Sequence, residues 1–347
     1  MTDTPLSRPP LRVLLVGAGR RVQNNYLPIL RYLDDQFDVR GIHSRTQERL
    51  NDVARRWDVP AVPSLATVEP GAFDVVAISV PTSQNANVLR QLLSQAADLH
   101  LVIDTPVVAN PKEHREIAPL LNRFKSVTVT EDYMNFPPFT LLRQFAAAGH
   151  IGPIRSLVLN QIGFLYHGLA LIRSFVGFGP VLNATRHPIG GDAWVVSYEF
   201  RDEFRASVIG PYRRHTAGGL TLEGTHGIVT EFAADLDAAK KPAFLLRPSI
   251  DGALSGYEIV GTDFRRSVDL PAIRALRAMA FEDKSDLNLL RSCGLGDVFR
   301  SIAHERNLNN LYGVANAFYD GFVSRRATAG IEPLDPLNIF RSPAASP

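Results

Sequence analysis

The residues with the clearest chemical potential form a glycine turn near the N-terminus. The aliphatic run Arg12–Val16 ends at Gly17-Ala18-Gly19, and apolar residues then recur at helical spacing, at Val22, Tyr26, Leu30 and Leu33. In such a strand-turn-helix unit, the first glycine permits the tight turn, the second lets backbone approach a pyrophosphate, and the helix N-terminus supplies N–H donors. We therefore expect dinucleotide phosphates to bind at four residues of this turn: Gly17, Gly19, Arg20 and Arg21.

The third glycine of the usual G-x-G-x-x-G pattern is absent, because Val22 occupies its position. That glycine normally allows close packing of the helix on the strand, so valine is expected to move the helix out slightly while leaving the phosphate site in place. A G-x-G pair alone is a weak signal and can mark a simple turn. The strand before it and the helix after it favour nucleotide binding.

The choice of cofactor can be read at the end of the next strand, where NAD-preferring domains place a carboxylate on the ribose 2′-hydroxyl. Here the residues are His43-Ser44-Arg45. The hydroxyl of Ser44 and the guanidinium of Arg45 can both donate to a 2′-phosphate, which a carboxylate would repel. We therefore expect NADP(H) rather than NAD(H), although Arg45 could also be a solvated loop residue.

Tyr133 is a candidate proton donor, because it follows Glu131-Asp132 at the end of the expected strand Ser126–Glu131. The carboxyl ends of strands in an open parallel sheet face the ligand crevice. A tyrosine in the hydrophobic core would fit the pattern equally well.

Alternating strands and helices are expected to position these groups in a doubly wound parallel sheet. The next helix, Gln47–Trp57, has Leu50, Val53, Ala54 and Trp57 on one face, and Asn110-Pro111 with Glu113 is typical of a helix N-terminus. The remaining expected elements of this half are strands at Phe37–Ile42, Asp74–Val80, Leu99–Ile103 and Ser126–Glu131, and a helix from Pro81-Thr82-Ser83 to about Ala97.

After Gly149 the pattern changes to period-two alternation, which predicts a large open, mostly antiparallel sheet in an α+β domain. Strands are expected at 154–164, 194–200, 204–209, 220–223, 227–232 and 264–270, followed by helices that include Leu311–Ser324. The predicted organisation is a tail at 1–10, an NADP-binding Rossmann domain at 11–132, a substrate and dimerisation domain at 133–340, and a tail at 341–347.

The composition excludes several classes of protein. The net charge of +2 gives no electrostatic case for nucleic acid, and no apolar run is long enough to cross a membrane. Cys293 is the sole cysteine, and the N-terminus has no apolar signal core, so we expect a cytoplasmic protein. The histidines show no paired ligand spacing on an expected helix, so no metal site is predicted.

These segments together resemble the glucose-fructose oxidoreductase and inositol dehydrogenase family, called Gfo/Idh/MocA. The similarity lies in VGAGRRVQNNYLPIL, AISVPTSQN with Pro81 and Asn85, DTP at Asp104–Pro106, EDYMNFPPF, GHIGPIRSL and the turn Gly224-Thr225-His226-Gly227. The resemblance implies a Rossmann domain followed by the open-sheet domain. It also implies that Pro81, Asn85 and Asp104 line the cofactor site.

The resemblance also implies a proton-transfer set that this chain has largely lost. Thr105 occupies the lysine position of the family's Glu-Lys-Pro motif, and Gly163 occupies the aspartate position of its Asp-x-x-x-His motif, so His167 alone remains. The five lysines, Lys112, Lys125, Lys240, Lys241 and Lys284, offer no obvious substitute. A positioned acid or base typically contributes about a hundred- to ten-thousand-fold in rate, so the loss is large.

Two functions follow from these residues. The first is an NADP(H)-dependent oxidoreductase that reduces a small polar carbonyl or imine-like substrate, or oxidises a sugar-like alcohol, with His167, Tyr133 and Thr105 as catalytic candidates. Histidine titrates near neutral pH, although His167 could be structural. The second is a non-catalytic protein that senses NADP(H) or a sugar. In either case the resemblance implies a homodimer or homotetramer formed through the C-terminal sheet.

Overall fold

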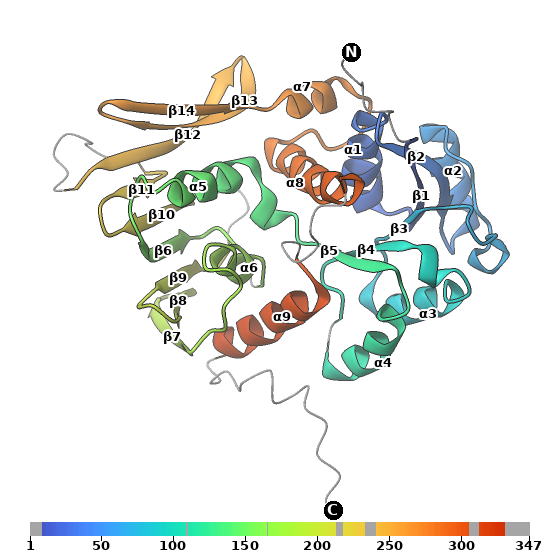
Figure 1. Cartoon of the computed structure of the whole chain (residues 1–347), viewed down its shortest axis with the longest axis horizontal. Coiled ribbons are helices and arrows are strands. Elements are labelled where there is room, and N and C mark those ends of the chain that lie inside the picture. The colour runs from blue at the N-terminus through green and yellow to red at the C-terminus, as the bar shows by residue number, and fades with distance from the viewer. Residues whose placement is uncertain are drawn as a thin grey trace, which may run out of the picture. The chain divides into compact units, whose positions relative to one another are not determined.

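The computed structural model describes residues 9–108, 110–164, 166–212, 218–232, 241–304 and 312–329. They belong to two compact units (Figure 1). The first unit comprises Met1–Asp132 and Ala272–Val314, and the second comprises Tyr133–Pro271 and Ala315–Pro347. The tails predicted at 1–10 and 341–347 lie outside the described residues, apart from Pro9 and Pro10.

The first unit is built on a parallel sheet of five strands among the described residues, in the order β2-β1-β3-β4-β5. The strands are β1 (Leu11–Val16), β2 (Phe37–His43), β3 (Val75–Ile78), β4 (His100–Asp104) and β5 (Ser126–Thr130). β1, β3 and β4 are mainly aliphatic and buried, which suits strands covered on both faces. The strand order reverses between β1 and β3, which creates the switch point where doubly wound sheets bind ligands.

Helices cover this sheet (Figure 1). They are the π-helix η1 (Val22–Tyr26), α1 (Leu27–Tyr32), α2 (Gln47–Trp57), α3 (Thr82–Gln91), α4 (Pro111–Leu121) and α8 (Asp286–Ala303), with short 3-10 turns at Leu65–Thr67 and Ala96–Asp98. Residues 272–278 of a further helix, α7 (Pro271–Ala278), also belong to this unit. α8 packs on η1 and α1, and α3 packs on α4. Phe299 of α8 makes edge contacts with the rings of Tyr26 and Phe37, at centroid distances of 6.0 and 5.3 Å. A helix from late in the chain therefore completes the core of the first unit.

The second unit contains a nine-stranded mixed sheet among its described residues, in the order β14-β13-β12-β11-β10-β6-β9-β8-β7. The pairs β11–β12 and β6–β9 are parallel and the others are antiparallel. The strands are β6 (Ile154–Asn160), β7 (Asn183–Gly190), β8 (Ala193–Glu199), β9 (Arg205–Gly210), β10 (Gly219–Gly224), β11 (Ile228–Thr230), β12 (Ala243–Asp251), β13 (Ala253–Gly261) and β14 (Phe264–Asp269). The predicted fold class, a Rossmann sheet followed by a largely antiparallel one, is confirmed.

The helices of the second unit are η4 (Tyr133–Asn135), α5 (Pro137–Ala147), α6 (Tyr166–Ser174) and α9 (Val314–Thr328). A buried ion pair joins α6 to α9: Arg173 Nη1 lies 2.6 Å from Asp320 Oδ1, and the two side chains are 4% and 0% exposed. The guanidinium of Arg173 also stacks 4.2 Å from the ring centroid of Tyr319 and donates to the carbonyl of Phe178. These contacts fix α9 against the body of the second unit.

Several elements differ from the sequence-based expectation. The helix after the glycine turn starts with an α-helical turn, in which Gln23 N–H donates to the carbonyl of Gly19, and then widens into the π-helix η1, in which Leu27 N–H donates to the carbonyl of Val22. α3 ends at Gln91 rather than near Ala97. Strands β7, β12 and β13 were not predicted. Residue 311, expected to begin the last helix, lies outside the described part of the chain, and α9 runs to Thr328.

Candidate functional site

The two glycines of the turn after β1 differ in backbone conformation and in the space around them. Gly17 has φ +126°, and a Cβ added there would lie 2.2 Å from the carbonyl oxygen of Ser79. Its N–H donates to the carbonyl of His43 at 2.8 Å. A Cβ added at Gly19 would meet no atom within 4 Å, and its backbone is not left-handed. The fold therefore requires a glycine at position 17. The open space beside Gly19, in contrast, leaves room for a group from outside the protein, such as a phosphate.

Two predicted residues at the end of β2 are close to the surface. Ser44 is half-buried and Arg45 is exposed. Arg45 Nη1 donates to Gln84 Oε1 of α3 at 2.8 Å, so the guanidinium is held between the end of β2 and the start of α3. The ring of His43 is turned inward, with Nδ1 2.8 Å from the carbonyl of Val62. The side-chain hydrogen-bond donors available to a ligand at the end of β2 are therefore those of Ser44 and Arg45.

The start of α3 supplies the next two predicted residues. Pro81 is exposed and immediately precedes the helix. Asn85 is 2% exposed, and its Nδ2 donates to the carbonyl of Val107 at 2.9 Å. Its Oδ1 is buried and has no hydrogen-bond donor within the described protein. A buried amide oxygen without a partner is costly unless another molecule satisfies it.

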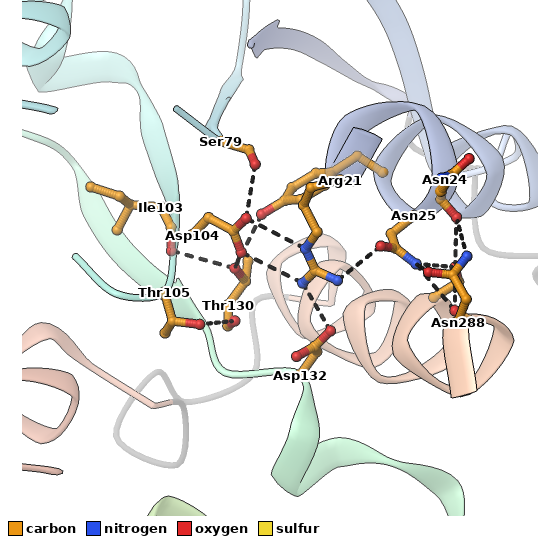
Figure 2. A network of polar contacts seen from close by, with 12 residues as sticks. Arg21, Asn24, Asn25, Ser79, Ile103, Asp104, Thr105, Thr130, Asp132 and Asn288 are labelled. Atoms are coloured by element: carbon orange, nitrogen blue, oxygen red, sulfur yellow. Dashed lines mark hydrogen bonds and ion pairs between the residues drawn. The ribbon is translucent and has the colours of Figure 1, made fainter. Parts of the chain in front are cut away.

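Arg20 and Arg21 follow the same turn but point differently. Arg20 is exposed, whereas the side chain of Arg21 lies along the carboxyl ends of β4 and β5 (Figure 2). Its Nη2 lies 2.8 Å from Asp132 Oδ2, and its Nε lies 3.4 Å from Asp104 Oδ2. Nη1 donates to Asn25 Oδ1 at 3.1 Å. Burial by itself lowers the pKa of Arg21, but Asp132 and Asp104 outweigh that effect and raise the pKa above its ordinary value.

Asp104 is held by donors on both carboxylate oxygens. Ser79 Oγ donates to Oδ2 at 2.8 Å, and Thr130 Oγ1 donates to Oδ1 at 2.7 Å. Burial raises the pKa of Tyr26 well above its usual value, so its phenol stays protonated. The Tyr26 hydroxyl lies 3.1 Å from Thr130 Oγ1 and donates to it, because the Thr130 proton is used on Asp104. With its lone pairs engaged in this way, Asp104 is an anchor for Arg21 rather than a base.

We call this network the Arg21 cluster; it comprises Arg21, Asp104 and Asp132 with their neutral partners. Asn25 connects the cluster to α8. Its Nδ2 donates to Asn288 Oδ1 at 3.0 Å and lies 3.0 Å from Ser292 Oγ. Asn288 Nδ2 donates in return to the carbonyl of Asn24 at 3.1 Å. The π-turn of η1 therefore places an amide between the cluster and the helix that covers it (Figure 2).

The three catalytic candidates are divided between the two units. Thr105 belongs to the first unit, and its hydroxyl donates to the carbonyl of Thr130 at 3.4 Å. Tyr133 and His167 belong to the second unit, where η4 packs on α6 and the two ring centroids are 6.1 Å apart. The ring of Tyr166 lies 4.1 Å from that of His167. The second unit thus brings the phenol of Tyr133 and the imidazole of His167 together with a second phenol, that of Tyr166.

The backbone explains why residue 163 carries no side chain. Gly163 has φ +81°, and a Cβ added there would lie 2.8 Å from Gly168 Cα. An aspartate at this position would be strained and crowded.

Sequence reasoning missed several members of the network: Asn25, Ser79, Thr130, Asp132 and Asn288. For Asp132 a signal existed, because it directly follows a strand at the carboxyl edge of the sheet. Among the described residues, no cluster of three or more histidine, cysteine, aspartate or glutamate side chains could hold a metal ion, and no helix is long and apolar enough to cross a membrane.

The fold and the glycine turn define a protein with a dinucleotide-binding Rossmann domain. Residues 11–133 match the model of the family GFO_IDH_MocA, described as an oxidoreductase family with an NAD-binding Rossmann fold. The resemblance inferred from the motifs is thus confirmed for residues 11–133, which correspond to the Rossmann domain of that family. A search of curated protein sequences finds no match.

Solved structures agree with the fold over nearly the whole chain. Levoglucosan dehydrogenase in complex with NADH and levoglucosan has 13% identity and a TM-score of 0.65, with 92% of this chain and 96% of that chain covered. An NAD-binding oxidoreductase from Klebsiella pneumoniae has 12% identity and a TM-score of 0.66, with 93% and 97% covered. The transcriptional regulator Gal80p from Kluyveromyces lactis has 13% identity and a TM-score of 0.63, with 93% and 91% covered. At these identities the similarity establishes the fold alone.

Proposed function

We propose that this protein is an NADP(H)-dependent oxidoreductase that reduces a small polar carbonyl or imine-like substrate, or oxidises a sugar-like alcohol. The observation that carries the proposal is the glycine turn, with Gly17 closed against Ser79 and open space beside Gly19. The bound nicotinamide nucleotide would supply or accept the hydride. The backbone N–H groups at the turn would bind its phosphates, and the buried Oδ1 of Asn85 offers an acceptor to a nearby ligand donor.

The preference for NADP(H) is supported by the end of β2. Arg45 is held by Gln84 at 2.8 Å through one nitrogen, which leaves further guanidinium N–H groups for a 2′-phosphate. Residues 43–45 contain no carboxylate that would bind a free 2′-hydroxyl and repel that phosphate. Two of the similar structures carry NADH or NAD in their names, so the preference proposed here rests on this chain's own residues.

Dissociation constants for NADPH and NADH test the preference directly. A hydrogen bond to a charged group is worth about 1.5 to 3 kcal/mol, so Arg45→Gln should weaken NADPH binding by about 10- to 150-fold and leave NADH binding nearly unchanged. Arg55→Gln is a matched control, because Arg55 is exposed in the last turn of α2. Tighter binding of NADH than of NADPH by the unmodified protein would contradict the proposal.

For proton transfer we propose His167 with Tyr133. The two rings lie 6.1 Å apart in one unit, and either side chain can donate a proton to a carbonyl oxygen or an imine nitrogen. Thr105 can offer a hydrogen bond but cannot act as a base near neutral pH. Reduction of an electrophilic carbon needs mainly such a donor, whereas alcohol oxidation also requires a base, so the residues favour reduction.

NADPH consumption against a panel of ketones, imines and sugars tests this assignment. His167→Ala should lower turnover by about a hundred- to ten-thousand-fold, whereas His304→Ala, at an exposed histidine after α8, should not change it. Unchanged turnover in His167→Ala would remove His167 from the mechanism.

A second candidate function is a non-catalytic protein that binds NADP(H) or a sugar and signals its state. Thr105 and the crowded Gly163 support it, because neither can supply the missing acid–base groups. The fold also occurs in a transcriptional regulator. This alternative predicts micromolar or tighter NADP(H) binding with no hydride transfer to any member of the panel.

We also propose self-association through the sheet of the second unit, as a homodimer or homotetramer. Ile189 and Ile250, on β7 and β12, are 58% and 63% exposed, and exposed apolar residues on a sheet favour a protein partner. A monomer in light scattering at micromolar concentration would refute this. With Cys293 as the sole cysteine, we expect a reducing, cytoplasmic location.

A further inference from the structure

Arg21 is held differently from the other cations near the glycine turn. Arg20 and Arg45 are exposed, whereas the Arg21 side chain is 24% exposed and lies between Asp104 and Asp132, which are 15% and 7% exposed (Figure 2). Asn25 fixes one guanidinium nitrogen, and the ring of Tyr26 lies 5.6 Å from the guanidinium carbon. The charge is therefore immobile and only partly solvated.

The position of this charge follows from the sheet. Asp104 ends β4, Asp132 follows β5, and Ser79, which anchors Asp104, follows β3. If a dinucleotide binds as proposed above, its phosphates lie at the glycine turn and its 2′-phosphate lies at the end of β2. Because a dinucleotide spans the switch point, its second nucleoside then lies over the carboxyl ends of β3, β4 and β5. The nicotinamide end of the ligand therefore approaches the Arg21 cluster.

We propose that Arg21, set against Asp104 and Asp132, determines which redox form of the nicotinamide nucleotide the site prefers. The oxidised ring carries one positive charge and the reduced ring carries none. The ratio of the two affinities therefore reports the electrostatic potential that the cluster imposes on the ring. Arg21 disfavours the oxidised form and the two carboxylates favour it. This inference rests on the proposed NADP(H) site and names a determinant within it.

The charges of the cluster give opposite predictions for two substitutions. One guanidinium and two carboxylates leave one net negative charge. Arg21→Gln makes the cluster more negative and Asp132→Asn makes it neutral, while the double variant returns it to the charge of the unmodified protein. In a poorly solvated site, one unit of charge changes the binding of a nearby charge by about tenfold or more.

The experiment measures dissociation constants of NADP⁺ and NADPH for the full chain by titration calorimetry. We expect the ratio Kd(NADP⁺)/Kd(NADPH) to fall about tenfold in Arg21→Gln, to rise about tenfold in Asp132→Asn, and to return to within about threefold of its original value in the double variant. Arg20→Gln is the matched control, because loss of this exposed charge should weaken both forms equally and leave the ratio unchanged.

The outcomes separate this inference from the function on which it rests. If the unmodified protein binds neither nucleotide at millimolar concentration, both the NADP(H) site and the role of Arg21 are wrong. If both nucleotides bind but the ratio moves less than twofold in Arg21→Gln and Asp132→Asn, only the role of Arg21 is overturned. Should Arg21→Gln fail to fold, the rise in Asp132→Asn and its reversal in the double variant decide the question.

Discussion

Alanine substitutions at the two glycines of the turn should have opposite consequences. At Gly17 an added Cβ would lie 2.2 Å from the Ser79 carbonyl oxygen, on a backbone with φ +126°. The left-handed conformation costs a non-glycine residue about 1 to 3 kcal/mol, and relief of the clash must separate the ends of β1 and β3. We expect Gly17→Ala to lower the free energy of unfolding by about 3 kcal/mol or more.

Gly19→Ala should leave the stability of the protein unchanged or slightly raised. The added methyl group meets no atom within 4 Å and the backbone is not left-handed, so reduced freedom of the unfolded chain can even contribute about 0.4 to 1 kcal/mol. The same methyl group would displace a phosphate from the backbone N–H groups. The loss of one charge-assisted hydrogen bond, about 1.5 to 3 kcal/mol, raises the Kd for NADPH by about 10- to 150-fold.

Urea unfolding of the ligand-free variants and titration with NADPH measure the two effects separately. The reasoning requires that Gly17→Ala lose stability and that Gly19→Ala lose only affinity. An unfolding midpoint for Gly19→Ala as low as that for Gly17→Ala would show that the turn needs both glycines for folding. Unchanged NADPH affinity in a stable Gly19→Ala variant would refute the assignment of this turn as the phosphate site.

Three further outcomes can be checked in the second unit. Asp320→Ala should lower the free energy of unfolding by about 3 to 5 kcal/mol, because it leaves the charge of Arg173 buried without its carboxylate; a loss below 1 kcal/mol in urea unfolding would contradict this. Gly163→Asp should destabilise the protein by about 1 to 3 kcal/mol and restore no activity, because the Cβ meets Gly168 Cα; higher NADPH turnover would contradict that reasoning. Burial raises the pKa of Glu231 to about 7, so the folded state keeps this proton to a higher pH than the unfolded chain does. The resulting contribution to the free energy of unfolding is fully present below pH 4.5 and is lost as the pH rises through 7. Relative to Glu231→Gln, the native protein should therefore lose about 2 to 3 kcal/mol between pH 4.5 and 8 in pH-dependent unfolding, and parallel pH profiles would exclude the shift.

The elements that the sequence predicted well have strong local signals. The helix Gln47–Trp57 has its expected bounds, because its apolar positions repeat every three to four residues and face the sheet. The start of α4 was also correct: Asn110 Oδ1 accepts from Glu113 N at 3.0 Å, and Glu113 Oε1 accepts from Asn110 Nδ2 at 2.9 Å. In both cases neighbouring residues alone determine the structure.

The rest depended on contacts between residues distant in sequence. β12 was missed because Arg247 and Pro248 interrupt its apolar alternation. The ion pair between Arg247 Nε and Glu258 Oε1 of the next strand, at 2.7 Å, explains the arginine in this strand. The inward path of Arg21 required Asp104 and Asp132, which are more than 80 residues further along the chain. The sequence placed this arginine at the expected ligand site because it follows a glycine turn, but its orientation could not be read from its neighbours.

The path of the chain between the units has a consequence for synthesis on the ribosome. The chain leaves the first unit after Asp132, returns at Ala272 and leaves it again after Val314. The nucleotide-binding unit therefore lacks α8 until Phe299, Asn288 and Ser292 have been translated. Until then Tyr26 and Phe37 lack their aromatic partner on the helix and Asn25 lacks its amide partner. A nascent chain that ends near residue 132 should thus expose an apolar surface that attracts chaperones, although it already contains every strand of its sheet.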